Sequence, residues 1–148
     1  MRSSSLETKI AVPLLILRVT LGLFLLLWAV DKFIAPEHAT AIFGHFYFIE
    51  DLPHFGAYVL GGLQTLLCIA LIAGYKRAIT YLIAFLVHGV STVSTAKHIF
   101  LPWGFEGWNM LFMTGVPVLA AFWLLYAVRE WDVLSLDGRA TAPAAHTV

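Results

Sequence analysis

The chain alternates long apolar stretches with shorter polar ones, and this pattern predicts four membrane-spanning helices. Each apolar stretch is about 20 residues, which matches a hydrocarbon core of about 30 Å at a rise of about 1.5 Å per residue. The expected spans are residues 11–33, 55–74, 78–98 and 108–128. Residues 1–138 are expected to form one all-α domain, an antiparallel four-helix membrane bundle. A frayed polar start and a disordered tail, residues 139–148, complete the chain.

The segments between the spans differ in length. Residues 31–54 and 97–107 are rich in aromatic and histidine side chains, and we expect them to lie along the outer membrane surface. Residues 74–77 (GYKR) predict a tight turn between the second and third spans. Pro117 predicts a kink in the middle of the fourth span. The tryptophans and tyrosines are expected at the interfaces or on the lipid-facing surface.

Composition supports a membrane protein and excludes several other classes. Hydrophobic residues make up 60% of the chain and charged residues 12%, against about 45–50% and about 25% in soluble domains. The formal net charge is zero, so the chain offers no basic face for nucleic acid. Its single cysteine, Cys68, excludes an internal disulfide. The expected partners are the lipid bilayer and a partner protein or a second copy of the chain.

The distribution of basic residues predicts the orientation. With four spans both termini lie on one side, and that side carries six Lys and Arg residues while the opposite side carries two. Because cytoplasmic segments are enriched in Lys and Arg, we expect the termini in the cytoplasm and the two aromatic segments outside.

A polar stripe runs along the first span. At helical spacing Arg18, Gly22, Leu25, Ala29 and Lys32 share one face. Since a charge near hydrocarbon costs about 2.5–3.5 kcal/mol, we expect this face to meet other helices or a polar cavity.

The role of Arg18 has two interpretations. Its side chain either snorkels to the headgroups or lies inside the bundle, paired with Glu130 or Asp132. Inside the bundle its guanidinium is either purely structural or a ligand for a quinone carbonyl or a lipid phosphate.

Gln64 and His88 lie at similar depth, roughly 12–14 Å from the outer edge, on neighbouring antiparallel spans. We expect them to bond each other, or His88 to use Ser91, Thr92 or Thr95. The pair acts either as interhelical polar glue or, at His88, as a quinone donor or proton relay.

The outer segments offer weak candidates for a metal site. His54 and His98 lie at similar height, with Glu106 in possible reach, but no tight ligand spacing such as HxxxH is present. Lys32 is expected either to anchor the interface or to pair with Glu106 or Asp51. His54, His98 and Glu106 therefore stay candidate metal ligands, and no metal is assigned to them.

Several short motifs resemble those of the DoxX-like family of small four-helix bacterial membrane proteins. They are Arg18-x3-Gly22, WAVDKF at residues 28–33, GGLQ at residues 61–64 and LSLDG at residues 134–138. Two positions depart from the family pattern. Ala29-Val30 replaces a frequent glycine, and Gln64 stands where an acid is often found, which weakens any assignment of proton-coupled chemistry.

The resemblance implies a multi-pass protein of the bacterial inner (plasma) membrane. Some members of the family are subunits of thiosulfate:quinone oxidoreductase, and others accompany redox or stress proteins. The expected function is a membrane subunit or anchor that docks a partner protein in a redox-linked, quinone-associated complex, and whether the chain is itself an enzyme is left open. The alternatives are a quinone-interacting oxidoreductase subunit with its own ligand site, and an assembly factor or small-molecule carrier. The candidate quinone site is formed by Arg18, Gln64 and His88, and Lys32 is a further candidate ligand-binding residue.

Overall fold

The structure, a computed structural model, describes residues 2–50, 52–101, 103–104 and 110–140. The described part is helical and contains no strand. Its elements in chain order are α1 (Arg2–Ile34), α2 (Pro36–Tyr47), α3 (His54–Ala73), α4 (Arg77–Ser94), α5 (Ala96–Phe100), η1 (Met110–Thr114), α6 (Gly115–Ala127), η2 (Arg129–Trp131) and α7 (Leu136–Ala140).

Four helical stretches are long and apolar enough to cross a membrane. They are Thr8–Ile34, His54–Ala73, Arg77–Ser94 and Met110–Ala127. They coincide with the four predicted spans, so the expectation of an all-α chain with four apolar helices of membrane-spanning length is confirmed. These helices mark the chain as a multi-pass membrane protein.

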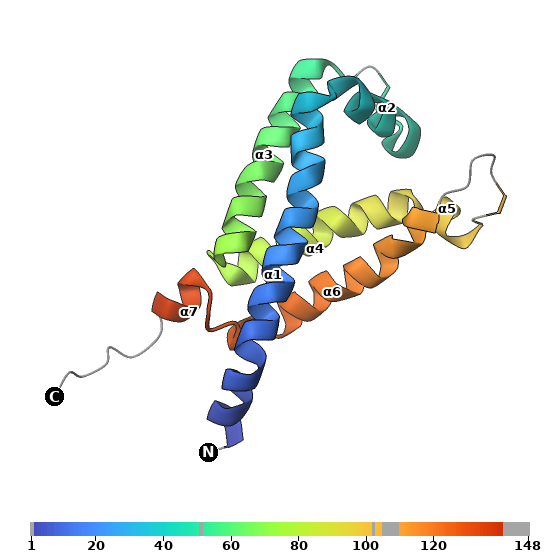
Figure 1. The fold of residues 1–148 in the computed structure, drawn as a ribbon. Coiled ribbons are helices and arrows are strands. Elements are labelled where there is room, and N and C mark those ends of the chain that lie inside the picture. Colours follow the sequence, from blue (N-terminus) through green and yellow to red (C-terminus); the bar gives the residue numbers. More distant parts are fainter. Residues whose placement is uncertain (1, 51, 102, 105–109, 141–148) are drawn as a thin grey trace.

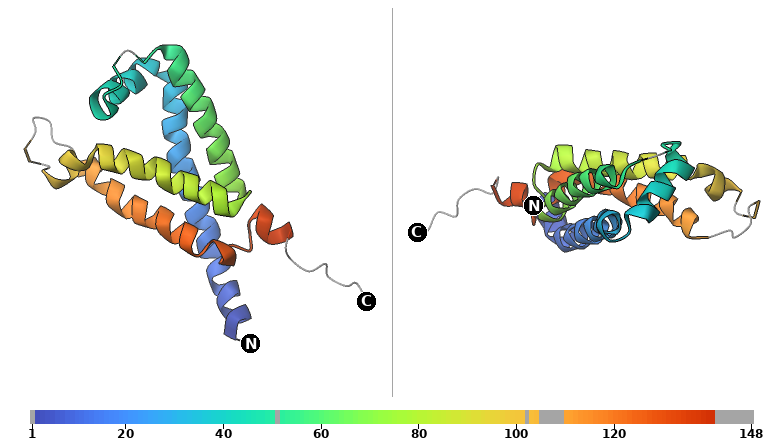
Figure 2. Two further views of the ribbon diagram at one scale, coloured as in Figure 1. Left: turned by 180° about the vertical axis from the view of Figure 1, so that it is seen from behind. Right: turned by 90° about the horizontal axis from the view of Figure 1, so that it is seen from above.

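The helices are arranged as two antiparallel pairs, α1 with α3 and α4 with α6 (Figure 1). The pairs meet at the turn between α3 and α4, close to α7, and diverge away from it (Figure 2). Helices α2 and α5 lie at the far, open end. The helices are antiparallel within each pair, and the contact between the pairs is concentrated at one end, so the four-helix membrane bundle stays a prediction.

Small residues allow α1 and α3 to pack closely. A Cβ atom added at Gly22 would overlap the side chain of Ile72, and one added at Gly61 would lie 2.9 Å from the Phe33 ring. Ala29 lies on α1 between Gly22 and Phe33, and it is fully buried. Small residues of this kind let helix backbones approach each other in membranes. The predicted stripe on the first span thus faces another helix.

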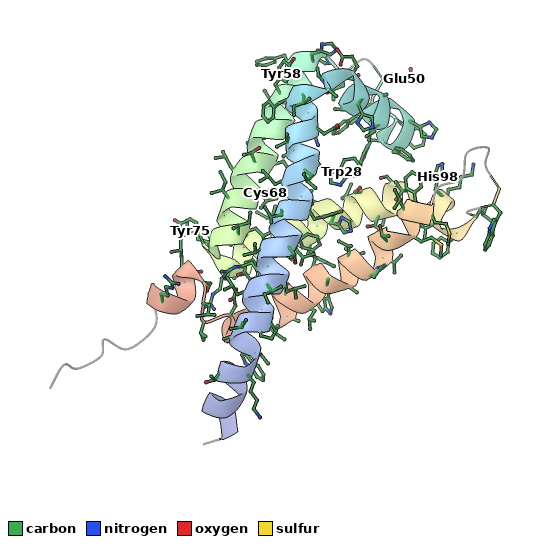
Figure 3. The ribbon with its side chains drawn as sticks, viewed as in Figure 1. Trp28, Glu50, Tyr58, Cys68, Tyr75 and His98 are labelled. Atoms are coloured by element: carbon green, nitrogen blue, oxygen red, sulfur yellow. The ribbon has the colours of Figure 1, made fainter. Side chains whose placement is uncertain are left out.

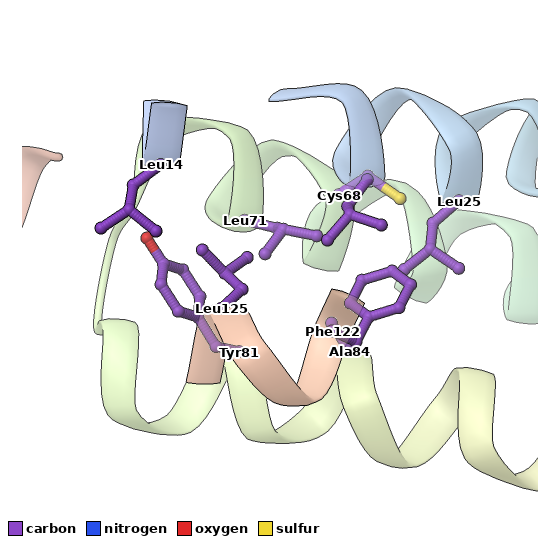
Figure 4. Packing of buried hydrophobic residues seen from close by; sticks show 9 residues of the cluster. Leu14, Leu25, Cys68, Leu71, Tyr81, Ala84, Phe122 and Leu125 are labelled. Atoms are coloured by element: carbon purple, nitrogen blue, oxygen red, sulfur yellow. The ribbon is translucent and has the colours of Figure 1, made fainter. Parts of the chain in front are cut away.

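The apolar core lies where the two pairs meet. It contains nine buried side chains: Leu14, Leu21, Leu25, Cys68, Leu71, Tyr81, Ala84, Phe122 and Leu125 (Figure 4). Every one of the four spans contributes to this cluster. Packing of these side chains and a polar cluster beside them hold the pairs together at this end.

The N-terminal segment differs from the sequence expectation. Helix α1 begins at Arg2, so the predicted frayed start is helical. The sequence before Pro13 contains neither glycine nor proline, and it is rich in good helix formers such as Leu6, Glu7 and Lys9. Nothing therefore stops the first span from extending toward the N-terminus.

The third span ends earlier than predicted, and Pro117 lies near the start of α6. Helix α4 stops at Ser94, because the hydroxyls of Ser94 and Thr95 both bond the carbonyl of Ser91, at 2.9 and 3.0 Å, and compete with the backbone. The predicted kink at Pro117 stays a prediction. Pro117 lies in the first turn of α6, directly after η1, where a missing N–H costs no helical hydrogen bond.

The connecting and terminal segments are partly helical. Residues Pro36–Tyr47 of the predicted surface segment form α2, with Pro36 at its first turn. Arg139 and Ala140, placed by prediction in a disordered tail, belong to α7. The rest of that predicted tail, residues 141–148, lies outside the described residues.

Candidate functional site

A buried ionic cluster lies where the two helix pairs meet. Arg18 of α1 is 2% exposed, and its Nη1 donates a 2.8 Å hydrogen bond to Oδ2 of Asp132, which is fully buried. Tyr81 of α4 donates to the same oxygen at 2.5 Å. Arg18 Nη2 donates to the Leu134 carbonyl at 3.2 Å. These four residues, the ionic cluster, join three segments that are distant in the sequence.

The position of Arg18 decides between its two sequence interpretations. The snorkelling interpretation is wrong, because the side chain is enclosed by protein. The internal interpretation is confirmed, with Asp132 as the partner. Glu130 is the other candidate, and it lies 3.7 Å from Arg129 instead. Within the described residues, Arg18 Nε and Asp132 Oδ1 are buried without a hydrogen-bond partner.

The turn between α3 and α4 packs directly on the ionic cluster. Gly74 ends α3 in the left-handed conformation, with φ of 69°. A Cβ atom there would overlap Arg18 Nη1 and the Ser135 side chain. Only glycine meets both demands, since it adopts this conformation without strain and leaves the space that the guanidinium occupies. The predicted tight turn at residues 74–77 is confirmed.

Residues 134–138 (LSLDG) fold back beneath this turn. Ser135 Oγ donates to the Asp132 carbonyl at 2.5 Å and accepts a 3.0 Å bond from the Gly138 N–H. The Asp137 carboxylate accepts from the N–H groups of Lys76 at 3.0 Å and Arg77 at 2.8 Å. Asp137 therefore caps the N-terminus of α4 from a distant segment, and its charge also suits the helix dipole there.

Arg77 completes the connection between α4 and the end of the fourth span. Its Nη1 donates to the carbonyls of Arg129 at 2.9 Å and Asp132 at 2.8 Å. These carbonyls follow the last turn of α6, and they also accept the backbone N–H groups of Asp132 at 3.2 Å and Ser135 at 3.4 Å. The guanidinium adds a charged donor where the carbonyls at a helix C-terminus carry partial negative charge. The side chain thereby fixes the backbone that carries Asp132.

Replacing Asp137 with alanine should destabilise the protein by about 1–2 kcal/mol, because the first N–H groups of α4 lose their cap. Asp137→Asn keeps one of the two acceptors and should cost less. Thermal unfolding in detergent, followed by circular dichroism, measures both variants. An alanine variant as stable as the natural chain would show that this cap contributes nothing.

Gln64 and His88 do not meet, so the predicted hydrogen bond between them is wrong. Gln64 Nε2 donates to the Leu25 carbonyl at 2.9 Å. His88 Nε2 donates to the Gly115 carbonyl at 3.1 Å, and its ring packs against Phe24 and Phe122. The alternative partners are not used by the His88 ring either. Counting residues from the ends of the spans estimates the depth of Gln64 and His88 in the membrane, but it does not give the rotation of each helix, which decides the direction of each side chain.

The three residues of the predicted quinone site are therefore separate. Arg18 belongs to the ionic cluster, Gln64 lies between α1 and α3, and His88 lies between α4 and α6. Each binds a group of this chain. What the arrangement shows is three polar ties between helices.

The outer candidates are also dispersed. His54 Nε2 lies 4.0 Å from a Glu37 carboxylate oxygen. His98 lies on α5 at the open end (Figure 3), and its ring packs beside His45, with centroids 5.9 Å apart. Lys32 donates to the Trp28 carbonyl at 2.9 Å. Its suggested partners Glu106 and Asp51 lie outside the described residues. Among the residues that are described, no three metal-ligating side chains gather.

Comparison of the chain with protein-family models, with curated proteins and with solved structures finds no match. The site is interpreted from its own contacts. Two of the motifs that carry the family resemblance, Arg18-x3-Gly22 and residues 134–138, are joined by the bond from Arg18 to Leu134. Sequence reasoning found Arg18 and Asp132 but missed Tyr81, which was expected at an interface and is buried.

Proposed function

We propose that this chain is a membrane subunit or anchor that docks a partner protein. One observation carries the proposal: Arg18, Gln64 and His88, the polar side chains within the spans that were candidates for chemistry, all bind groups of the chain itself. Their chemistry is used to hold helices in place. Because these interior polar groups are used within the chain, we place its function on the surface of the protein, in binding a partner.

The surface at the open end supports a docking role. Phe48, Phe100 and Trp103, the outer aromatic surface, are 88%, 78% and 78% exposed. Phe48 directly follows α2, and Phe100 is the last residue of α5. These helices are in contact through Phe46 and His98, whose ring centroids are 5.3 Å apart. Large apolar side chains exposed together mark interaction sites.

The nature of the partner is proposed from the resemblance to the DoxX-like family. Members of that family accompany redox proteins at the bacterial membrane. We therefore place the chain in the bacterial inner membrane, with its termini in the cytoplasm, in a redox-linked complex associated with quinone. The excess of Lys and Arg on the terminal side supports this orientation.

Purification of the tagged chain in a mild detergent should recover one partner protein at a fixed ratio. Combined alanine substitution of Phe48, Phe100 and Trp103 should remove the partner, because it deletes the outer aromatic surface. Alanine at Leu27 and Leu66, which are also exposed but lie in the middle of spans, is the matched control and should keep the partner.

Two results would contradict docking through this surface. One is a stable natural chain with no stoichiometric partner, and the other is equal loss of the partner in both sets of variants. Solvent extraction of the same preparation tests the quinone alternative. A stoichiometric quinone that disappears in a folded His88→Ala variant would support direct quinone chemistry in place of docking.

A further inference from the structure

A pocket lies beside the ionic cluster, at the surface of the end where the helix pairs meet. Its volume is about 280 Å³, and its lining residues are Arg77, Ala78, Arg129, Glu130 and Asp137. Arg77 is the first residue of one candidate span, and Arg129 follows the last residue of another, Ala127, by two positions. The pocket therefore lies at the level where a membrane surface would meet the protein.

Arg77 has hydrogen-bonding capacity left over. Its Nη1 group is occupied by the carbonyls of Arg129 and Asp132. Among the residues that the structure describes, its side-chain hydrogen bonds are the two made by Nη1, and its Nε lies 3.9 Å from Oδ2 of Asp137 although the side chain is only 15% exposed. The two carbonyl bonds hold the planar guanidinium in a fixed orientation. Two N–H donors thus remain for a ligand, already oriented.

Arg129 is the second donor in the pocket. Its Nη1 donates to the Tyr126 carbonyl at 3.0 Å, and its guanidinium lies over the Tyr126 ring, 4.6 Å from the centroid. Its Nη2 is 3.7 Å from a Glu130 oxygen, and the Glu130 side chain is 79% exposed. An ion pair this exposed contributes little to the free energy of folding, so another anion could take the place of Glu130 beside Arg129 with little loss of stability.

The two acids that line the pocket lie at long ion-pair distances from these donors: Asp137 Oδ2 is 3.9 Å from Arg77 Nε, and Glu130 Oε1 is 3.7 Å from Arg129 Nη2. The two oxygens of Asp137 already accept the backbone N–H groups of Lys76 and Arg77 at the start of α4. Glu130 extends into solvent from the rim. The donors that line the pocket are therefore two guanidinium groups, one from α4 and one from η2.

We propose that this pocket binds the phosphate diester of a phospholipid headgroup. Arginine recognises phosphate through paired, charge-assisted hydrogen bonds. Basic pockets between membrane helices are established places for lipid headgroups. The parts of α4 and α6 next to the pocket carry exposed apolar side chains, among them Ile79 and Leu124. The acyl chains of a bound lipid would contact these side chains in the adjoining bilayer. The site is independent of the partner docked at the open end.

Native mass spectrometry of the full chain, delipidated in detergent and titrated with phosphatidylglycerol, tests the proposal. The natural chain should retain one lipid that survives gentle activation. Arg129→Gln should weaken its apparent affinity about tenfold, the effect of losing charge-assisted hydrogen bonds to the phosphate. Arg129→Lys keeps the positive charge but loses the paired N–H donors of the guanidinium, and its affinity should lie between those of the natural chain and Arg129→Gln. Arg139→Gln removes the same charge from an exposed position outside the pocket and should bind like the natural chain.

Three outcomes would overturn the proposal. The first is that the natural chain retains no lipid. The second is that Arg129→Gln and Arg139→Gln lose equal affinity, which would indicate nonspecific attraction. The third is displacement of the lipid by inorganic phosphate at a similar concentration, which would make the site one for a free anion. Matching thermal unfolding of the two glutamine variants confirms that lost binding is not lost folding.

Discussion

Replacing Asp132 with alanine is expected to destabilise the folded protein by about 3–5 kcal/mol. The substitution leaves the Arg18 guanidinium buried without its counter-charge, and Tyr81 loses its acceptor. A buried unpaired charge is among the few single changes with so large an effect. Reversible unfolding in mixed micelles measures the loss of free energy, and the folded yield in membranes should fall with it.

Glu130→Ala is the matched control for that experiment. Glu130 is an acid two residues earlier in the same segment, but it is exposed, and among the described residues its ion pair is with Arg129. Its removal should change the free energy of unfolding by less than about 0.5 kcal/mol. If the two alanine variants unfold alike, the ionic cluster does not hold the helix pairs together.

Replacing Gly74 with alanine is the second large expected effect, at about 2–4 kcal/mol. The residue must keep φ of 69°, which costs an L-amino acid energy, and its new methyl group must displace Arg18 or Ser135. The loss therefore combines backbone strain with damage to the ionic cluster. Unfolding in micelles reports it directly.

Gly62→Ala provides the comparison for Gly74. Gly62 lies within α3, and a Cβ atom added there meets nothing within 4 Å. Since alanine is a better helix former than glycine, this variant should be as stable as the natural chain or more stable. A Gly74→Ala protein as stable as Gly62→Ala would contradict the packing of the turn on Arg18.

The sequence was sufficient to predict the spans and part of the ionic cluster. Apolar runs of membrane-spanning length located all four helices. Inside the bundle, the charge of Arg18 requires a partner of opposite charge, and the candidates in the sequence are Glu130 and Asp132 at the end of the fourth span. Asp132 is that partner because it is buried while Glu130 is exposed, a difference that depends on how the chain turns after α6.

Other features depend on distances that the sequence does not contain. Tyr81 was expected at an interface from its residue type, and only the rotation of α4 places its hydroxyl on Asp132. The same rotation separates His88 from Gln64. The role of Asp137 required knowing that residues 134–138 return beneath Gly74. In each case local pattern fixed the element, and packing between elements fixed the partner.

A double-mutant cycle on Arg18 and Asp132 tests most directly whether these two side chains lock the helix pairs together. The account predicts that Arg18→Met and Asp132→Leu are each strongly destabilising alone. The combined variant should recover much of the loss, giving a coupling free energy of at least about 2 kcal/mol. Losses that simply add, with a coupling below about 0.5 kcal/mol, would contradict it.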